Sequence, residues 1–219
     1  MTQPPADNLP WPELPDERFP VISLDPPWHF HTRAPVRNAA ADRSPQVHYP
    51  TADLEHLATL PVARAAAPDA HVFLWITGPL LVAGAANFLF EAWGVRPAAL
   101  AFVWIKLWNG FDTAQLRRTP LLDQDIAMGG GYTTRQNAEY CVLGRLGAPR
   151  RARADIRQVI VSPRREHSRK PEEYYRRVEH YAAGPRLDMF AGADRPGWSR
   201  WGYGHRHGEG ARFAGRTGS

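Results

Sequence analysis

The sequence contains a single cysteine, Cys141, among 219 residues. One cysteine excludes an internal disulfide and a cysteine cluster that could hold structural zinc, which indicates a reducing environment. No stretch approaches the roughly 20 apolar residues that a membrane-spanning helix requires, and no basic segment followed by an apolar run opens the sequence. We therefore expect a cytoplasmic protein that is neither exported nor bound to a membrane.

The sequence also lacks a clear metal-binding pattern. His29 with His31, and His205 with His207, are isolated pairs without further ligands at a spacing that suits a metal ion. Cys141 lies within an apolar run and is most simply a core residue, because a nucleophilic cysteine would need a paired base that the sequence does not reveal. We therefore expect no metal.

The remaining composition suits one globular domain. Hydrophobic residues make up 43% of the chain, and the formal net charge of +5 with a pI near 9.7 favours a polyanionic partner such as nucleic acid. Proline-rich residues 1–20 are expected to form an extended arm, residues 21–204 the folded domain, and the glycine-rich and charged residues 205–219 a disordered tail.

Apolar runs predict five strands, at residues 21–24, 71–76, 99–105, 138–143 and 187–190. Helices are predicted at residues 79–93, closed by Gly94, and at residues 171–181, closed by Gly184. Strands that are apolar on both faces and alternate with helices indicate an α/β fold with a mostly parallel sheet covered by helices.

Three polar segments interrupt this pattern. Residues 31–50 carry arginines among small residues and prolines, and we interpret them as a loop that could close over substrate. Residues 106–136, with Trp108 and a triple glycine, are expected to leave the sheet and contact substrate. Residues 150–157 are basic enough to follow a phosphate backbone, although a solvated surface explains them equally well.

The tetrapeptide Asp25-Pro26-Pro27-Trp28 follows the first predicted strand, at the end where open parallel sheets place their ligand sites. The Asp25 carboxylate and a free Pro26 carbonyl could accept the two hydrogens of an adenine amine, which would draw its nitrogen out of conjugation with the ring. Trp28 could stack on an extruded base, a contact worth roughly 1–3 kcal/mol. The alternative is a rigid proline turn with a packed tryptophan.

Further motifs accompany DPPW in a fixed order: the runs HVFLWIT, ALAFVWIK, GYTTRQNAEYCVLGRLG, HSRKPEE, LDMFAG and GWSRWG. Together they resemble the DPPW-type adenine-N6 methyltransferases, which include the catalytic subunit of the eukaryotic messenger-RNA methyltransferase and many bacterial and phage DNA enzymes. The resemblance covers residues 21–202. It implies a seven-stranded Rossmann-like fold with permuted motif order, S-adenosyl-L-methionine as cofactor and a nucleic acid as substrate.

The resemblance also implies roles for individual residues. It places Lys170 near the methionine carboxylate of the cofactor, although a lysine at the start of a helix is often simply solvated. Glu139 falls in a segment near the target base, or could pair with Arg135. The catalytic residues would be Asp25, Pro26, Pro27 and Trp28. The cofactor-binding residues would be Asp25, Ser168, Lys170, Phe190, Gly192, Gly202 and Tyr203. The substrate-binding residues would be Arg135, Asn137 and Glu139.

The cofactor end departs from the family pattern. Tyr203 and Gly204 stand where many members have an asparagine followed by glutamine or glutamate for the ribose, and Gly192 stands where an arginine often follows the strand. Asp194, Arg195 or Tyr203 could compensate.

We therefore predict direct transfer of a methyl group to adenine N6, without a covalent enzyme intermediate. DNA is preferred because the chain is short, lacks added RNA-binding modules, and has an alanine-, arginine- and proline-heavy composition typical of a GC-rich bacterial or phage source. The alternatives are the same reaction on RNA, a catalytically silent nucleic-acid-binding subunit, and a methyltransferase for a small-molecule or protein amine. A dimer is compatible with the sequence.

Overall fold

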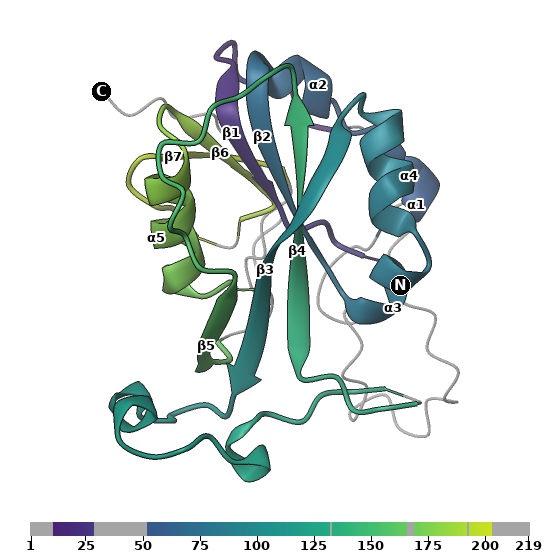
Figure 1. Cartoon of the computed structure of the whole chain (residues 1–219). Helices are drawn as coiled ribbons and strands as arrows, with labels where there is room; N and C mark the ends of the chain where they lie inside the picture. Colours follow the sequence, from purple (N-terminus) through teal and green to yellow (C-terminus); the bar gives the residue numbers. More distant parts are fainter. Residues whose placement is uncertain (1–10, 29–51, 132, 166–168, 192, 203–219) are drawn as a thin grey trace.

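Seven strands form one twisted sheet through the described part of the protein (Figure 1). The computed structural model describes residues 11–28, 52–131, 133–165, 169–191 and 193–202. The strands are β1 (Phe19–Leu24), β2 (Ala66–Ile76), β3 (Arg96–Leu107), β4 (Ala138–Leu146), β5 (Val159–Pro163), β6 (Arg186–Met189) and β7 (Trp198–Trp201). Their order is β5-β3-β4-β2-β1-β6-β7, and only β4 runs antiparallel to its neighbours. The prediction of a mostly parallel α/β sheet is confirmed.

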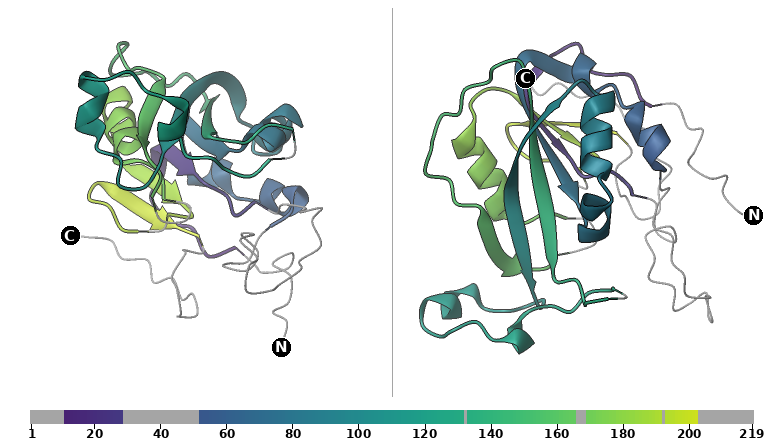
Figure 2. Two further views of the ribbon diagram at one scale, coloured as in Figure 1. Left: turned by 90° about the horizontal axis from the view of Figure 1, so that it is seen from below. Right: turned by 45° about the vertical axis from the view of Figure 1, so that its right-hand side comes forward.

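Helices cover both faces of this sheet (Figure 2). The helices are α1 (Leu54–Ala58), α2 (Val62–Ala65), α3 (Gly78–Val82), α4 (Ala85–Ala92) and α5 (Glu172–Tyr181). α1, α3 and α4 lie on one face and α5 on the other. The single helix predicted at residues 79–93 was wrong, because Gly84 adopts φ 81° and separates α3 from α4. Gly94 follows α4 in the left-handed conformation, with φ 67°.

Alternation along the strands supplies two hydrophobic cores. Ile22 in β1 and Val72 in β2 belong to the core beneath α1 and α4, whereas Val21 and Phe73 belong to the core beneath α5. Successive side chains of a strand point to opposite faces, so buried central strands must be apolar at nearly every position. This requirement explains the continuous apolar runs in the sequence.

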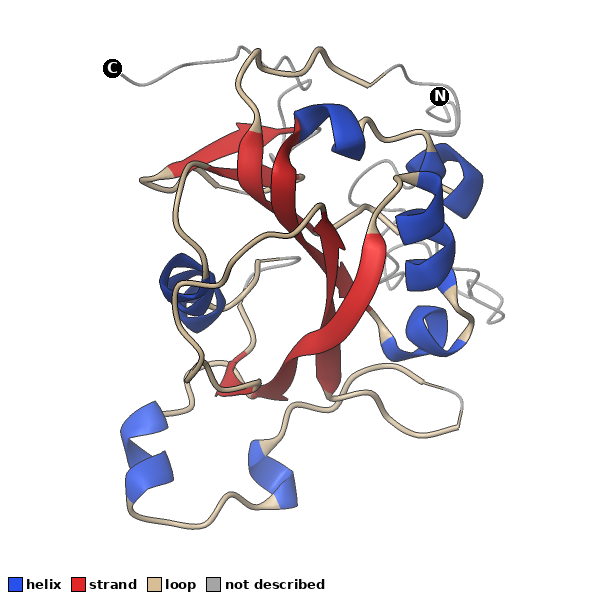
Figure 3. Ribbon diagram, turned by 45° about the horizontal axis from the view of Figure 1, so that its top comes forward, coloured by secondary structure: helices blue, strands red, loops and turns tan. Residues whose placement is uncertain are grey.

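The parallel strands all end at one edge of the sheet, where the start of β4 joins them. β3 and β4 are connected there by residues 108–137, here called the β3–β4 arm, which extends away from the sheet (Figure 3). The arm contains the short 3-10 helices η4 (Thr113–Arg117) and η5 (Asp123–Asp125). The arm returns through a tight hairpin in which a Cβ on Gly129 would lie 2.2 Å from the Gln136 carbonyl oxygen. The excursion predicted for residues 106–136 is thus observed.

Of the N-terminal arm predicted at residues 1–20, residues 11–18 form no helix or strand, whereas Phe19 and Pro20 already belong to β1. Residues 11–18 pack against the domain through Trp11, whose ring stacks on His56 at 4.3 Å and whose indole nitrogen donates to Thr59 Oγ1 at 2.9 Å. The loop predicted at residues 31–50 and the tail at residues 205–219 lie outside the described residues. None of the helices in the described ranges is long and apolar enough to cross a membrane.

Candidate active site

Four charged side chains form a chain of ion pairs at the carboxyl edge of the sheet. The Lys170 ammonium Nζ lies 2.6 Å from Asp25 Oδ2 and 3.2 Å from Glu139 Oε2. The other Glu139 oxygen pairs with Lys106. We call Asp25, Lys106, Glu139 and Lys170 the charged quartet.

Different elements bring the members of the quartet together. Asp25 directly follows β1, and its backbone N–H donates to the Met189 carbonyl of β6 at 3.4 Å. Lys106 and Glu139 lie near the end of β3 and the start of β4, where the antiparallel register sets Trp104 opposite Glu139. Lys170 immediately precedes Pro171, the N-cap of α5. The predicted residues Asp25, Glu139 and Lys170 are therefore neighbours in space.

The quartet balances two cations against two carboxylates in a partly buried setting. Burial opposes the charged forms of both Glu139 and Lys170. The two neighbouring lysines nevertheless lower the pKa of Glu139 to about 2, and the two carboxylates raise the pKa of Lys170. For Asp25, burial outweighs the attraction of Lys170 and raises the pKa of the carboxyl. Asp25 is therefore the carboxylate of the quartet that more readily accepts a proton.

The remainder of the DPPW tetrapeptide is packed rather than open. Trp28 is buried, and its indole nitrogen donates to the Trp75 carbonyl at 3.2 Å. The expectation of a free Pro26 carbonyl was wrong, because this oxygen accepts from the Trp28 backbone N–H at 2.8 Å. A carbonyl keeps a second lone pair for another donor. In this conformation the proline turn with a packed tryptophan describes the motif, and Trp28 has little free face for a base.

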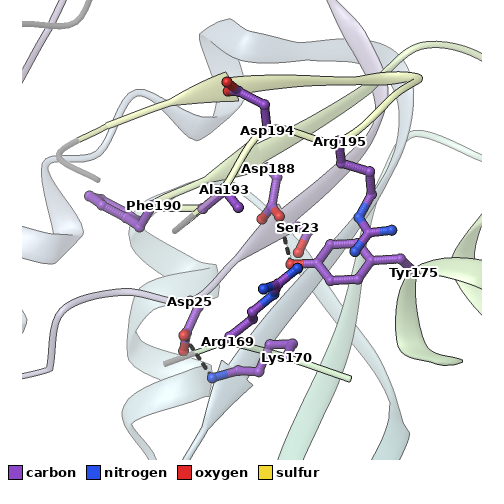
Figure 4. A pocket seen from close by; sticks show the side chains of 11 residues that line it. Ser23, Asp25, Arg169, Lys170, Tyr175, Asp188, Phe190, Ala193, Asp194 and Arg195 are labelled. Carbon is purple, nitrogen blue, oxygen red and sulfur yellow. Dashed lines mark hydrogen bonds and ion pairs between the residues drawn. The ribbon is translucent and has the colours of Figure 1, made fainter. Parts of the chain in front are cut away.

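A small pocket lies beside the quartet (Figure 4). Asp25 and Lys170 line one part of it, and Asp188 and Tyr175 line another. Tyr175 donates its hydroxyl hydrogen to Asp188 Oδ2 at 2.9 Å. Burial raises the pKa of Asp188 to about 7, although the hydrogen bonds from Tyr175 and Ser23 oppose this rise. The pocket therefore contains a carboxyl group that is part protonated at neutral pH.

The predicted cofactor residues Phe190 and Gly202 meet at the end of β6 and β7. Phe190 has φ 70°, and its backbone N–H donates to the Trp201 carbonyl at 2.7 Å. Gly202 has φ 95°, and a Cβ there would lie 2.9 Å from the Phe190 ring. Only glycine permits this close approach without a shift. Of the other predicted cofactor residues, Asp25 and Lys170 belong to the quartet, and Ser168, Gly192 and Tyr203 lie outside the described residues.

Two residues named as possible compensation, Asp194 and Arg195, also line the pocket. The Arg195 guanidinium lies 3.8 Å from the centroid of the Tyr175 ring and pairs with Glu172. Asp194 is exposed and lies 3.2 Å from Arg200. The C-terminal side of the pocket thus has charged groups of both signs.

The predicted substrate residues separate into two groups. Glu139 belongs to the quartet, whereas Arg135 and Asn137 are exposed on the returning part of the β3–β4 arm. The alternative pairing of Glu139 with Arg135 was wrong, since the two lysines occupy its carboxylate. Asn137 is placed by its backbone, whose carbonyl accepts from the Lys106 N–H at 2.9 Å.

The sequence analysis did not identify Lys106 or the Tyr175–Asp188 pair as parts of the site. The sequence did contain a signal for Lys106, which is a lysine at the carboxyl end of the apolar run ALAFVWIK. Asp25 likewise follows directly after an apolar run. The hydrogen bond from Tyr175 to Asp188 had no signal in the sequence, because it depends on how α5 packs across β6. Within the described ranges, no group of three or more histidine, cysteine or acidic residues is placed to hold a metal ion.

Comparison with known proteins gives consistent matches. A family model described as MT-A70 matches residues 19–204. The chain is 29% identical over 213 residues to the Type II methyltransferase M.MunI of Mycoplasma sp, which covers 90% of this chain and 82% of that protein. It is 30% identical over 175 residues to the N(6)-adenosine-methyltransferase MT-A70-like protein of Arabidopsis thaliana, with 79% and 21% coverage. It is 26% identical over 176 residues to the N(6)-adenosine-methyltransferase catalytic subunit METTL3 of Homo sapiens, with 79% and 25% coverage. The chain thus spans most of M.MunI but a quarter or less of these two eukaryotic relatives.

Proposed function

Because the chain belongs to the MT-A70 family of S-adenosylmethionine-dependent adenine-N6 methyltransferases, we propose that it methylates adenine N6 in DNA. The observation that carries this proposal is the position of Asp25. Its carboxylate is held by Lys170 at 2.6 Å and lines the pocket at the carboxyl edge of the sheet. An acceptor placed beside a cofactor pocket is what an amine needs when it must lose a proton during methyl transfer.

The chemistry of the pocket residues suits S-adenosylmethionine, which carries a carboxylate, an ammonium, a sulfonium and two ribose hydroxyls. Lys170 suits the carboxylate, since an ammonium has three donors and the two described ion pairs use two of them. Asp188 and Asp194 suit the positive or hydroxyl-bearing groups. Gly202 leaves room beside Phe190 where a Cβ would not. When bound, the cofactor supplies an electrophilic methyl group on positively charged sulfur.

Asp25 and Pro26 would orient the amine. The Asp25 oxygen that is not described as bonded to Lys170, and the second lone pair of the Pro26 carbonyl, are the acceptors for the two N6 hydrogens. Formation of the bond from N6 to the methyl carbon breaks the carbon–sulfur bond, and N6 must then release one proton. The raised pKa of Asp25 makes its carboxylate a better proton acceptor than an ordinary aspartate, while Lys170 holds it in place.

One comparison favours DNA over RNA. M.MunI, a relative matched over most of both lengths, is a Type II methyltransferase, whereas the N(6)-adenosine relatives are four to five times as long as the matched region. RNA is the second candidate, favoured by the 26% and 30% identities to N(6)-adenosine methyltransferases.

The test is a parallel reaction with labelled S-adenosylmethionine and unmethylated DNA or RNA, followed by mass spectrometry of the nucleosides. N6-methyldeoxyadenosine is the expected product, and Asp25→Ala should abolish it. Asp16→Ala is the matched control, because Asp16 is an exposed aspartate that does not line the pocket and takes part in none of the described ion pairs. Product from RNA alone would replace DNA with RNA. An Asp25→Ala protein that still methylates adenine would end the proposed role of Asp25. Binding of the cofactor, measured by calorimetry, without any product would favour the silent subunit.

A further inference from the structure

Trp108 is an exposed tryptophan that is nevertheless held in place. Its side chain is 39% exposed, whereas the six tryptophans of the described cores are 1% to 9% exposed. Its indole nitrogen donates to the Gln124 carbonyl at 2.9 Å. The Arg164 guanidinium lies over the ring, 4.7 Å from its centroid, and Arg164 Nε donates to Asn109 Oδ1 at 3.1 Å. We call Trp108, Asn109 and Arg164 the Trp108 platform.

The fold sets this platform beside the charged quartet. Trp108 follows the last residue of β3 and lies two positions after Lys106, a separation of roughly 7 Å along an extended chain. Arg164 follows the last residue of β5, which runs parallel to β3, and its backbone N–H donates to the Leu107 carbonyl at 2.9 Å. The platform is therefore at the same edge of the sheet as Asp25 and Lys170, and on the arm side of them.

An exposed aromatic ring beside a guanidinium has the chemistry of a nucleic-acid contact. Trp108 belongs to neither hydrophobic core, so burial of apolar surface does not explain why a large aromatic residue occupies this position. Bases stack on aromatic rings with little regard to sequence, and arginine binds phosphate through several N–H donors. The hydrogen bonds of Trp108 and Arg164 fix both groups before a ligand arrives, which reduces the entropy lost on binding.

We propose that the Trp108 platform binds the nucleotide next to the target adenine. The base of that nucleotide stacks on the face of Trp108 that Arg164 does not cover, and Arg164 contacts its phosphate. Removal of the adenine from the base stack uncovers the face of its neighbour, and Trp108 covers that face again. This inference rests on the proposed function, since it assigns a second contact to the same nucleic-acid substrate.

The test compares Trp108→Ala, Trp108→Phe and Arg164→Gln with the wild-type protein. Binding of a labelled DNA oligonucleotide with one unpaired adenine is followed by fluorescence anisotropy without cofactor, and methylation of the same DNA is measured in parallel. Phe88→Ala is the matched control, because Phe88 is an aromatic residue with 44% exposure on α4, which packs on the other face of the sheet from α5. Circular dichroism checks that every variant is folded.

Trp108→Ala should weaken DNA binding about tenfold, which corresponds to the loss of one stacked base. Trp108→Phe should restore most of this loss, because phenylalanine keeps an aromatic face. Arg164→Gln should reduce the slope of log affinity against log salt by about one unit. In methylation, Trp108→Ala should raise KM more than it lowers kcat.

The proposed role of the platform would be overturned if Trp108→Ala bound DNA with wild-type affinity. It would also be overturned if Phe88→Ala lost as much DNA affinity as Trp108→Ala. The two proposals can fail separately. A wild-type protein that yields no methylated adenine, while Trp108→Ala loses binding, would refute the proposed function and keep the platform as a nucleic-acid contact without a target adenine beside it. A wild-type protein that methylates DNA, while Trp108→Ala binds and methylates normally, would refute the platform alone.

Discussion

Replacement of Lys170 by methionine removes the one cation that Asp25 and Glu139 share. Methionine keeps the length and apolar volume of the lysine stem, so the change mainly deletes charge. The Lys170 side chain is 6% exposed, and those of Asp25 and Glu139 are each 19% exposed. Glu139 retains Lys106, but Asp25 keeps no described ion-pair partner. The variant therefore has an uncompensated and largely buried carboxylate.

Loss of one partner from a buried ion pair typically costs about 3–5 kcal/mol, and we expect a destabilisation of this size at neutral pH. The matched control is Arg153→Met. Arg153 and Asp155 form an exposed pair, with side chains 55% and 64% exposed, and its loss should cost less than about 1 kcal/mol. Urea unfolding followed by far-ultraviolet circular dichroism measures the free energy of unfolding for both variants.

The cost of Lys170→Met should also depend on pH. Without Lys170, burial raises the pKa of Asp25 further above its ordinary value. The folded variant then retains a proton that the unfolded chain loses near pH 4, so its stability falls as the pH rises from about 4 towards the folded pKa. The difference from wild type should therefore be larger at pH 7.5 than at pH 5. Asp25→Asn added to Lys170→Met should recover much of the loss, because it removes the stranded charge. A loss no larger than that of Arg153→Met, or one independent of pH, would refute this account of the quartet.

Two further predictions concern the pocket. In wild type, the pKa of Asp188 is raised from 3.8 to about 7, so Asp188 lowers the free energy of unfolding progressively as the pH rises from about 4 to about 7. Asp188→Asn should remove this slope, which urea unfolding at pH 5 and pH 8 would detect; an unchanged slope would show that Asp188 ionises normally. Gly202→Ala should cost about 1–3 kcal/mol and weaken cofactor binding in calorimetry, because its Cβ would lie 2.9 Å from the Phe190 ring at φ 95°. Gly197→Ala has positive φ but no atom nearer than 4.0 Å, so an equal effect on cofactor affinity in that variant would exclude the Phe190 contact as the cause.

Long, uniformly apolar segments were predictable because burial on both faces leaves a strong pattern. β2, β3 and β4 were located on this basis, although each is longer than the apolar run that revealed it. β5 and β7 were not located as separate strands. β7 has only four residues and includes the polar Ser199 and Arg200, so its pairing with β6 decides its conformation. The break between α3 and α4 was missed because a glycine within a helical pattern does not reveal its own φ.

Residues of the site could be predicted where a short sequence motif marks them. Asp25 and Lys170 could be identified from their motifs. The position of Lys106 at the end of an apolar run marks it as a candidate, but only the register of β3 and β4 shows that it pairs with Glu139. That register sets Trp104 opposite Glu139 and Ile105 opposite Ala138. Sequence spacing does not determine the pairing of strands separated by a 30-residue arm, because loop closure is nearly indifferent to a change of a few residues. The three-dimensional structure was needed to show that the four residues of the quartet contact one another.

The charge balance of the quartet bears on how the pocket can meet a positively charged ligand. Two lysines already neutralise Asp25 and Glu139, so the quartet alone offers no net negative charge to a positively charged ligand. Asp188 lies across the pocket with a pKa of about 7 and can become an anion at little cost. Positive charge arriving nearby lowers the pKa of a carboxyl and favours its ionised form. Asp188 can therefore stay partly protonated while the pocket holds no cation and become more fully ionised when one binds, whereas a permanently ionised residue at the same depth would carry its desolvation cost at all times.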